Sequence, residues 1–324
     1  MKVLRDLLNK LNFRKILNLL IIAAAVVVAA IIIFRDSGTI DWTKLRFRPL
    51  YLILGYLVAT SGLLISIPVW RSILRVFGVN AHLREDILFY NLGLLGYALP
   101  GGIWSIASRV SLYSAQSYSG TAVIVAGVLE ALITGVAGLI LYAVTAISWK
   151  NIDLVENPFL VVGIAVLSFI ILHPKVFSRI SSVILKKSKH ADFQNITSYK
   201  FIHLLFWIIG EAIVITLGST GLFLLLESFT QVDLSAWAAV LSAWSAANAV
   251  SALLFWVPGT PILRDGAMAL ALTTIIPLAS AIIFVVVQRV WTLVSLLLNA
   301  FVVWLIFGHP MKVREKRTLS PNNP

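Results

Sequence analysis

Residues 276–307 read IPLASAIIFVVVQRVWTLVSLLLNAFVVWLIF, and Arg289 is the one charged residue among them. An α-helix rises 1.5 Å per residue, so about 20 apolar residues cross the roughly 30 Å hydrocarbon core of a bilayer. This stretch is therefore long enough to cross a membrane. Elsewhere in the chain, similar apolar runs lie at 16–34, 51–70, 119–147, 159–173 and 201–227. We predict an all-α polytopic membrane protein with about six transmembrane helices.

The composition agrees with a bilayer as the solvent. Of the 324 residues, 59% are hydrophobic and 12% are charged, and the mean hydropathy is +0.94. Such a chain has too little polar surface to cover a water-soluble protein. Cysteine is absent, which excludes disulfides, thiolate metal sites and cysteine nucleophiles. We expect no metal and no cofactor.

The chain has a net charge of +12, and its basic residues are distributed in a way that orients membrane helices. Basic residues gather in the N-terminal tail, in 71–85, in 174–200 and after 308, which the predicted helices place on one side of the membrane. Arg35, Lys44, Arg46 and Arg48, in the first outer loop, are an exception. We expect a multi-pass cell-membrane protein with both termini cytoplasmic and with 309–324 as a basic cytoplasmic tail. This distribution does not indicate a nucleic-acid partner.

Two further apolar stretches are broken in the middle. Residues 86–117 are interrupted by Pro100, Gly101 and Gly102, and residues 236–274 by Pro258 and Gly259. Proline removes a backbone donor, and a bend survives in a membrane only where protein or a wet cavity satisfies the freed groups. We predict two re-entrant helical hairpins, each made of two short helices joined by a bend at these residues.

The two bends indicate an internal repeat. They lie 258 − 100 = 158 residues apart, and the same offset places Glu130 on Gln288 and Tyr97 on Phe255. We predict two inverted repeats, 1–157 and 158–308. Each contains two helices, a hairpin and a long helix, which is 119–147 in the first repeat and 276–307 in the second. Matching interrupted segments in two halves are typical of transporters that bind their substrate at the repeat interface.

Six ionisable residues lie in or beside apolar runs: Arg109, Glu130, Glu211, Arg264, Asp265 and Arg289. Each charge costs roughly 2.5–3.5 kcal/mol on insertion scales and is expected to face the bundle interior. In one interpretation the three arginines bind a lipid phosphate, because the guanidinium fork matches phosphate oxygens, and the three carboxylates balance their charge. In the other interpretation the arginines form structural ion pairs with these carboxylates.

The broken segments also carry a family resemblance. Residues 258–265, PGTPILRD, resemble the PGG-x-G-x-R-E signature of the flippase-like transmembrane domain of lysylphosphatidylglycerol synthases. Residues 91–109 are similar to its G-Y-x-x-P-G-G-x-x-R element, and Gln288-Arg289 resembles its intramembrane arginine. The chain departs from this pattern at Thr260-Pro261, Leu263 and Asp265, and Ala131 stands where a first-repeat counterpart of Arg289 would be.

The resemblance implies a stand-alone lipid flippase or transporter without a synthase domain. Its partner would be an anionic phospholipid or a polyprenyl-phosphate-linked sugar. One alternative is a membrane-embedded transferase acting on lipid phosphate, for which Asp265 and Glu130 would be the candidates for a general base or nucleophile. Another is a non-catalytic protein that presents lipid to a glycosyltransferase or lipid-modifying enzyme. We expect a transporter rather than an enzyme and assign no catalytic residue, and the sequence does not indicate an oligomeric state.

Overall fold

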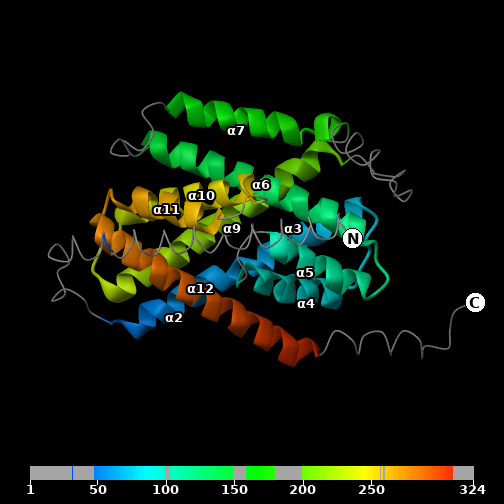
Figure 1. Cartoon of the computed structure of the whole chain (residues 1–324), viewed down its shortest axis with the longest axis horizontal. Helices are drawn as coiled ribbons and strands as arrows, with labels where there is room; N and C mark the ends of the chain where they lie inside the picture. The colour runs from blue at the N-terminus through cyan, green and yellow to red at the C-terminus, as the bar shows by residue number, and fades with distance from the viewer. Residues whose placement is uncertain are drawn as a thin grey trace, which may run out of the picture.

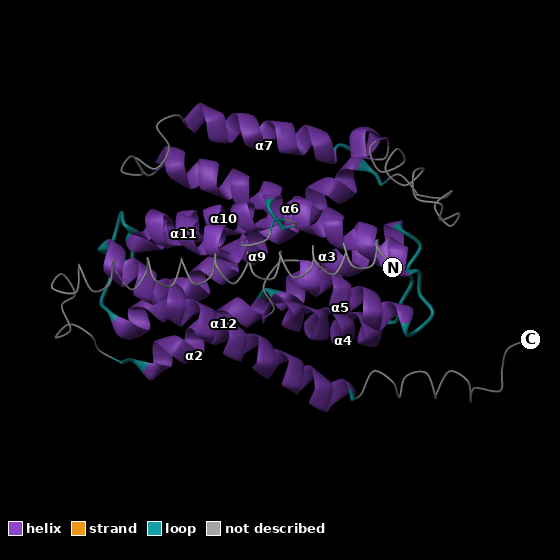
Figure 2. Ribbon diagram, in the orientation of Figure 1, coloured by secondary structure: helices purple, strands orange, loops and turns teal. Residues whose placement is uncertain are grey.

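The structure is a computed structural model that describes residues 31, 47–98, 103–148, 158–177, 179, 199–255, 257 and 260–308. Within these ranges every regular element is a helix (Figure 2). In chain order the elements are α2 (Pro49–Ser61), α3 (Leu63–Val76), α4 (Leu83–Leu94), the 3-10 helix η3 (Leu95–Ala98), α5 (Ile103–Ser114), α6 (Gly120–Ser148), α7 (Pro158–Leu172), α9 (Phe201–Phe229), α10 (Ala236–Leu253), α11 (Thr260–Leu272) and α12 (Leu278–Phe307).

Five helical segments of the described residues are long and apolar enough to cross a membrane: Pro49–Val76, Gly120–Thr145, Phe201–Phe229, Ala236–Leu253 and Leu278–Phe307. The first combines α2 and α3, because Gly62 between them keeps helical dihedral angles. Four of these segments coincide with predicted crossings, at 51–70, 119–147, 201–227 and 276–307. Helix α7 covers the predicted run 159–173 but has only 15 residues. Of the predicted crossing at 16–34 only residue 31 is described, and the tail 309–324 lies outside the described residues.

The outer surface of the bundle is apolar, most clearly along α12, which crosses the front of the molecule in Figure 1. Val290, Leu297 and Phe301 are 59%, 52% and 55% exposed. A contiguous apolar face of this kind is rare on a water-soluble monomer, whereas lipid chains cover it in a bilayer. The predicted fold class, an all-α polytopic membrane protein, is confirmed.

The long helices approach one another closely where small residues face each other. A Cβ atom on Gly221 of α9 would lie 2.8 Å from the Ala59 Cβ of α2 and 2.8 Å from the Gly55 carbonyl oxygen. A Cβ atom on Gly138 of α6 would lie 2.8 Å from the Ser245 carbonyl oxygen of α10. Small residues at helix crossings are the usual means of close packing in membranes. Helix α7 lies at the outer edge of the bundle, against α6 (Figure 1).

Helices α4 and α5 form an antiparallel hairpin. Glu85 bonds to Tyr118 and Asp86 to Tyr113, while nearer the turn a Cβ on Gly96 would lie 2.5 Å from the backbone of Trp104. Each helix has 12 residues, about 18 Å, which is too short to cross a bilayer. Residues 99–102 between them, which include Pro100, Gly101 and Gly102, lie outside the described residues.

The second broken segment differs from the first in the length of its arms. Helix α10 has 18 residues and could cross a membrane alone, whereas α11 has 13 residues. The two helices pack against each other, and Arg264 of α11 lies over the ring of Trp244 of α10. Pro258 and Gly259 lie outside the described residues, between these two helices. The expectation of two short arms therefore fits α11 but not α10.

Helices of the first half have counterparts in the second half about 158 residues later, which is the spacing between the two Pro-Gly pairs. Adding 158 to 103–114 of α5 gives 261–272, and α11 is Thr260–Leu272. Adding 158 to 120–148 of α6 gives 278–306, and α12 is Leu278–Phe307. Adding 158 to 83–94 of α4 gives 241–252, which lies within α10.

Candidate functional site

A cavity of about 320 Å³ lies between the long helices. Its walls include residues 127–134 of α6, 211–222 of α9 and 291–299 of α12, and each of these segments is near the middle of its helix. The middle of a membrane-crossing helix lies near the bilayer midplane. The cavity is thus at a depth where a charged side chain is costly and most often functional.

Four of the six predicted ionisable residues line this cavity: Arg109, Glu130, Glu211 and Arg264. They come from α5, α6, α9 and α11, so no pair of them shares a helix. The rest of the wall combines polar, aromatic and aliphatic side chains. Its hydroxyl and amide groups include Thr134, Asn248 and Asn299, and leucines and alanines are also present. Its aromatic rings include Tyr90, Tyr97, Trp244 and Trp291. Such a lining suits a ligand with one polar, charged part.

Arg109 is held from three sides. Its guanidinium lies 4.1 Å from the ring centre of Trp70 and 5.3 Å from that of Tyr90, and its Nη1 atom is 2.6 Å from Glu130 Oε2. A Cβ atom on Gly93 would lie 2.2 Å from Arg109 Cγ, so glycine leaves the space in which the side chain lies. Arg109 is only 2% exposed. The ion pair and the two cation–π contacts compensate for removing this charge from water.

Glu211 is the second buried carboxyl group of the cavity. It is 4% exposed, and its Oε2 atom accepts a hydrogen bond of 2.9 Å from Thr134 Oγ1. Its Oε1 atom has no hydrogen-bond partner within the described part of the chain. The hydrogen bond from Thr134 to Glu211 ties α6 to α9, while the Thr134 hydroxyl also lies 3.0 Å from the Glu130 carbonyl oxygen of its own helix.

Arg264 lines the cavity from the second turn of α11. Its guanidinium lies 4.8 Å from the ring centre of Trp244, and a Cβ atom on Gly218 of α9 would lie 2.8 Å from that indole nitrogen. The Arg264 Nε–H is buried and donates to no acceptor in the described residues. Unlike Arg109, it is without a carboxylate within 4 Å among these residues. Its donors are therefore available to a ligand.

The remaining predicted residues, Asp265 and Arg289, do not belong to the cavity lining. The expectation that Arg289 faces the bundle interior is wrong, because 47% of its side chain is exposed at the outer surface. They pair with each other, and Arg289 Nη2 also donates to the Pro261 carbonyl oxygen at 2.8 Å. Asp265 thus neutralises Arg289 of α12 rather than its neighbour in sequence, Arg264. Gln288, next to Arg289, is buried and donates to Thr292 at 2.7 Å.

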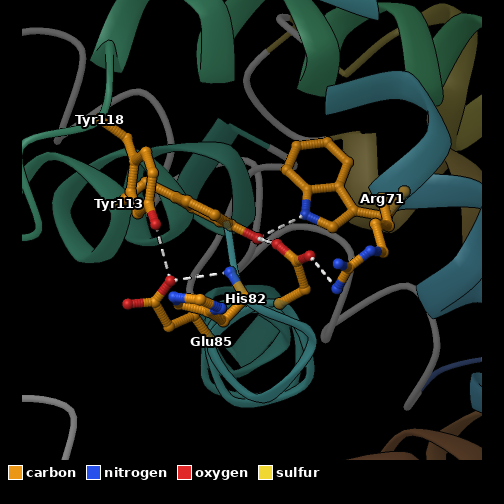
Figure 3. A network of polar contacts seen from close by, with 7 residues as sticks. Arg71, His82, Glu85, Tyr113 and Tyr118 are labelled. Carbon is orange, nitrogen blue, oxygen red and sulfur yellow. Dashed lines mark hydrogen bonds and ion pairs between the residues drawn. The ribbon is translucent and has the colours of Figure 1, made fainter. Parts of the chain in front are cut away.

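A second polar cluster lies beside the cavity, where α3, α4 and α5 meet (Figure 3). Asp86 accepts hydrogen bonds from Tyr113 at 2.7 Å and Arg71 at 2.9 Å, and Glu85 accepts one from Tyr118 at 2.7 Å. Burial raises the pKa of the Asp86 carboxyl group to about 6, although the Tyr113 hydroxyl and the Arg71 charge oppose this shift. Trp70 connects this cluster to the cavity, because its indole donates to Tyr113 at 3.0 Å while its ring stacks on Arg109.

Sequence reasoning missed the aromatic residues that hold the arginines. Trp70, Tyr90 and Trp244 are set in apolar runs, where an aromatic residue has no pattern that separates a cation–π partner from ordinary core. The structure also reveals Thr134 as a member of the site. The sequence could have indicated it, because it is a polar residue one helical turn after Glu130. No group of three or more histidine, aspartate or glutamate side chains in the described ranges could hold a metal ion.

No protein-family model matches the chain, and a search of curated proteins finds no significant match. The class therefore follows from the fold and the cavity alone. The protein is an all-α polytopic membrane protein whose long helices enclose a cavity lined by two arginines and two glutamates.

Proposed function

We propose that this protein is a transporter that moves an anionic lipid between the leaflets of the cell membrane, with the lipid phosphate bound at Arg264 and Arg109. The observation that carries this proposal is the pair of guanidinium groups on the wall of a cavity near the middle of the long helices. A site at this depth can be reached in turn from either leaflet, which is how secondary transporters work.

Arg264 is the primary ligand in this proposal. Its Nε–H is without an acceptor in the described residues, and a guanidinium fork matches two phosphate oxygens. Arg109 is already paired with Glu130, so it contributes a second, partly neutralised charge. Arg289 is left out of the proposal because Asp265 and the Pro261 carbonyl oxygen engage its guanidinium.

The arrangement of the cavity lining supports a repeat of two halves. Six pairs of lining residues are separated by 158 positions: Thr60 and Gly218, Tyr90 and Asn248, Leu94 and Ala252, Tyr97 and Phe255, Ile106 and Arg264, and Thr134 and Thr292. We take the two halves as inverted repeats that meet at the cavity and the α4–α5 and α10–α11 pairs as re-entrant hairpins. Rocking of one half against the other would then expose the same site on alternate sides.

A transferase is less well supported than a transporter. A transferase needs a base or nucleophile that converges with other groups on one site. Glu130 is paired with Arg109, and Asp265 is paired with Arg289 away from the cavity lining. The two candidate carboxylates therefore belong to different places. No contact within the described residues favours a protein that presents lipid to an enzyme.

The test is lipid movement in vesicles that contain the purified protein and fluorescent phosphatidylglycerol. Dithionite quenches the label in the outer leaflet and so reports the rate of exchange. Arg264→Gln should reduce this rate at least about tenfold, because hydrogen bonds to a charged group contribute about 1.5–3 kcal/mol. Its melting temperature should change little, since Arg264 is in no ion pair of the described residues.

Arg289→Gln is the matched control, because it removes the same charge on the neighbouring helix from outside the cavity lining. It should lower the melting temperature, through loss of the Asp265 pair, and leave the rate per folded molecule near that of the wild type. Wild-type protein that moves phosphatidylglycerol no faster than protein-free vesicles, or equal rates for both variants, would contradict the proposal.

A further inference from the structure

Glu211 lies in a setting that differs from that of the other cavity carboxylate. Glu130 has the Arg109 guanidinium 2.6 Å away, whereas Glu211 forms no ion pair within the described residues. The hydroxyl of Thr134 is its one hydrogen-bond partner in the described part of the chain, where Oε1 has none. A carboxyl group that is 4% exposed and lacks a cation has no partner that holds it in the ionised form, so its protonation can change with the charge that binds beside it.

The groups around Glu211 do not supply the missing charge. The ionisable side chains that interact with it are Glu130 of α6, Arg109 of α5 and Tyr90 of α4. Of these, only Arg109 is a cation, and Glu130 already neutralises it. The lining residues of α2, α3, α10 and α12 are uncharged, and Tyr97 and Arg264 are the other ionisable members of the lining.

The net charge of the cavity wall determines which ligand charge the cavity can bind. The two arginines and two glutamates add to zero when both carboxyl groups are ionised. A proton on Glu211 makes the sum +1, which one anionic head group would neutralise. In a low-dielectric cavity a change of one unit charge has a large effect on the binding of an ion.

We propose that Glu211 takes up one proton together with the anionic head group and releases it with the head group, so that transport is an anion–proton symport. This inference rests on the proposed function. The proton comes from solvent on the side where the lipid enters and forms an O–H bond at the Glu211 carboxyl group. It returns to solvent on the opposite side, and no bond of the lipid changes.

The coupling is reciprocal, as linkage requires. If a proton on Glu211 raises the affinity for the anion by some factor, the bound anion raises the proton affinity by the same factor. Couplings between two sites are typically 5-fold to 150-fold. We expect the affinity for an anionic lipid to rise on the order of tenfold as the pH falls through the titration of Glu211.

The experiment imposes a difference of one pH unit across vesicles that contain the protein and fluorescent phosphatidylglycerol, with the membrane potential clamped to zero. Protein-free vesicles correct for passive redistribution. Wild-type protein should accumulate the lipid in the leaflet on the alkaline side, up to about tenfold, because one proton accompanies each lipid. Glu211→Gln should lose this asymmetry.

The matched control is Glu227→Gln, on the same helix but outside the cavity lining and paired with Arg48 at 3.4 Å. It should keep the asymmetry. A second measurement needs only wild-type protein and this control: short-chain phosphatidylglycerol added in weakly buffered detergent should cause uptake of about one proton per protein, read with a pH-sensitive dye.

The outcomes separate the two proposals. Suppose that wild-type protein moves the lipid equally in both directions despite the pH difference and takes up no proton when the lipid binds. This result would overturn the symport and leave the transporter proposal intact. Asymmetry that persists in Glu211→Gln would overturn the role of Glu211. Absence of protein-dependent lipid movement would remove the transporter and the symport together.

Discussion

At the scale of single residues, the structure shows how buried charges are accommodated in an apolar chain. Arg109 combines one carboxylate with two aromatic rings, and Asp86 has Arg71 and Tyr113. At the outer surface Arg289, whose side chain is 47% exposed, has Asp265. Glu211 and Arg264 are less completely matched. Because a fully paired charge has few donors or acceptors left for a ligand, we base the binding proposal on the incompletely matched groups.

Asp86 gives a prediction for the dependence of stability on pH. Its pKa in the folded protein is about 6, against an ordinary value of 3.8, so the folded state holds this proton more tightly than the unfolded state. The contribution to stability is complete below about pH 4 and is lost as the pH rises through 6. It amounts to at most about 3 kcal/mol, since one pKa unit corresponds to about 1.4 kcal/mol.

The measurement is the melting temperature of wild type and Asp86→Asn between pH 4 and pH 7.5. The difference between the two curves should change across pH 4–6.5, because the asparagine does not titrate and all other groups are shared. Parallel curves for Asp86→Asn and the wild type would show that Asp86 is not the group that titrates.

At the scale of elements, the crossing of α2 and α9 depends on the absence of side chains. A methyl group on Gly221 would lie 2.8 Å from both Ala59 Cβ and the Gly55 carbonyl oxygen. Gly221→Ala should therefore force the helices apart and destabilise the protein by about 1–3 kcal/mol. Gly163→Ala on α7, where a Cβ meets nothing within 4 Å, should be neutral or slightly stabilising. Equal melting temperatures for the two variants would contradict this account of the crossing.

At the scale of the whole molecule, the basic segments predict which way the bundle is oriented. Both termini and residues 174–200 should face the cytoplasm, and the loop near residue 157 should face outside. The chain has no cysteine, so Lys187→Cys and Asn157→Cys each introduce a single reactive site. A membrane-impermeant thiol reagent added to intact cells should label the cysteine at 157 and spare the one at 187. Labelling of both from outside would contradict the orientation and the inverted repeats.

The sequence by itself determined the membrane class, four of the five segments that are long and apolar enough to cross a membrane, and Arg109, Glu130 and Glu211 as buried charges. It missed the buried carboxyl groups of Glu85 and Asp86, and it wrongly placed Arg289 in the interior. The class and the segments could be predicted because transfer of a helix into lipid depends on the composition of a local window of residues, which tertiary contacts barely alter. The length of α10 was missed because the Pro-Gly pair at 258–259 suggested a break in the whole stretch. In fact α10 is already continuous over 236–253.

Only the tertiary structure decided which charges meet. Arg264 and Asp265 are neighbours in sequence, yet Asp265 pairs with Arg289 while Arg264 lies over Trp244 in the cavity. Glu130 and Glu211 look equivalent in sequence, but only Glu130 reaches an arginine. Successive residues of a helix point about 100° apart, so a side chain finds its partner on whichever helix packs against its face. That choice depends on contacts between segments far apart in the chain, which no local pattern of residues records.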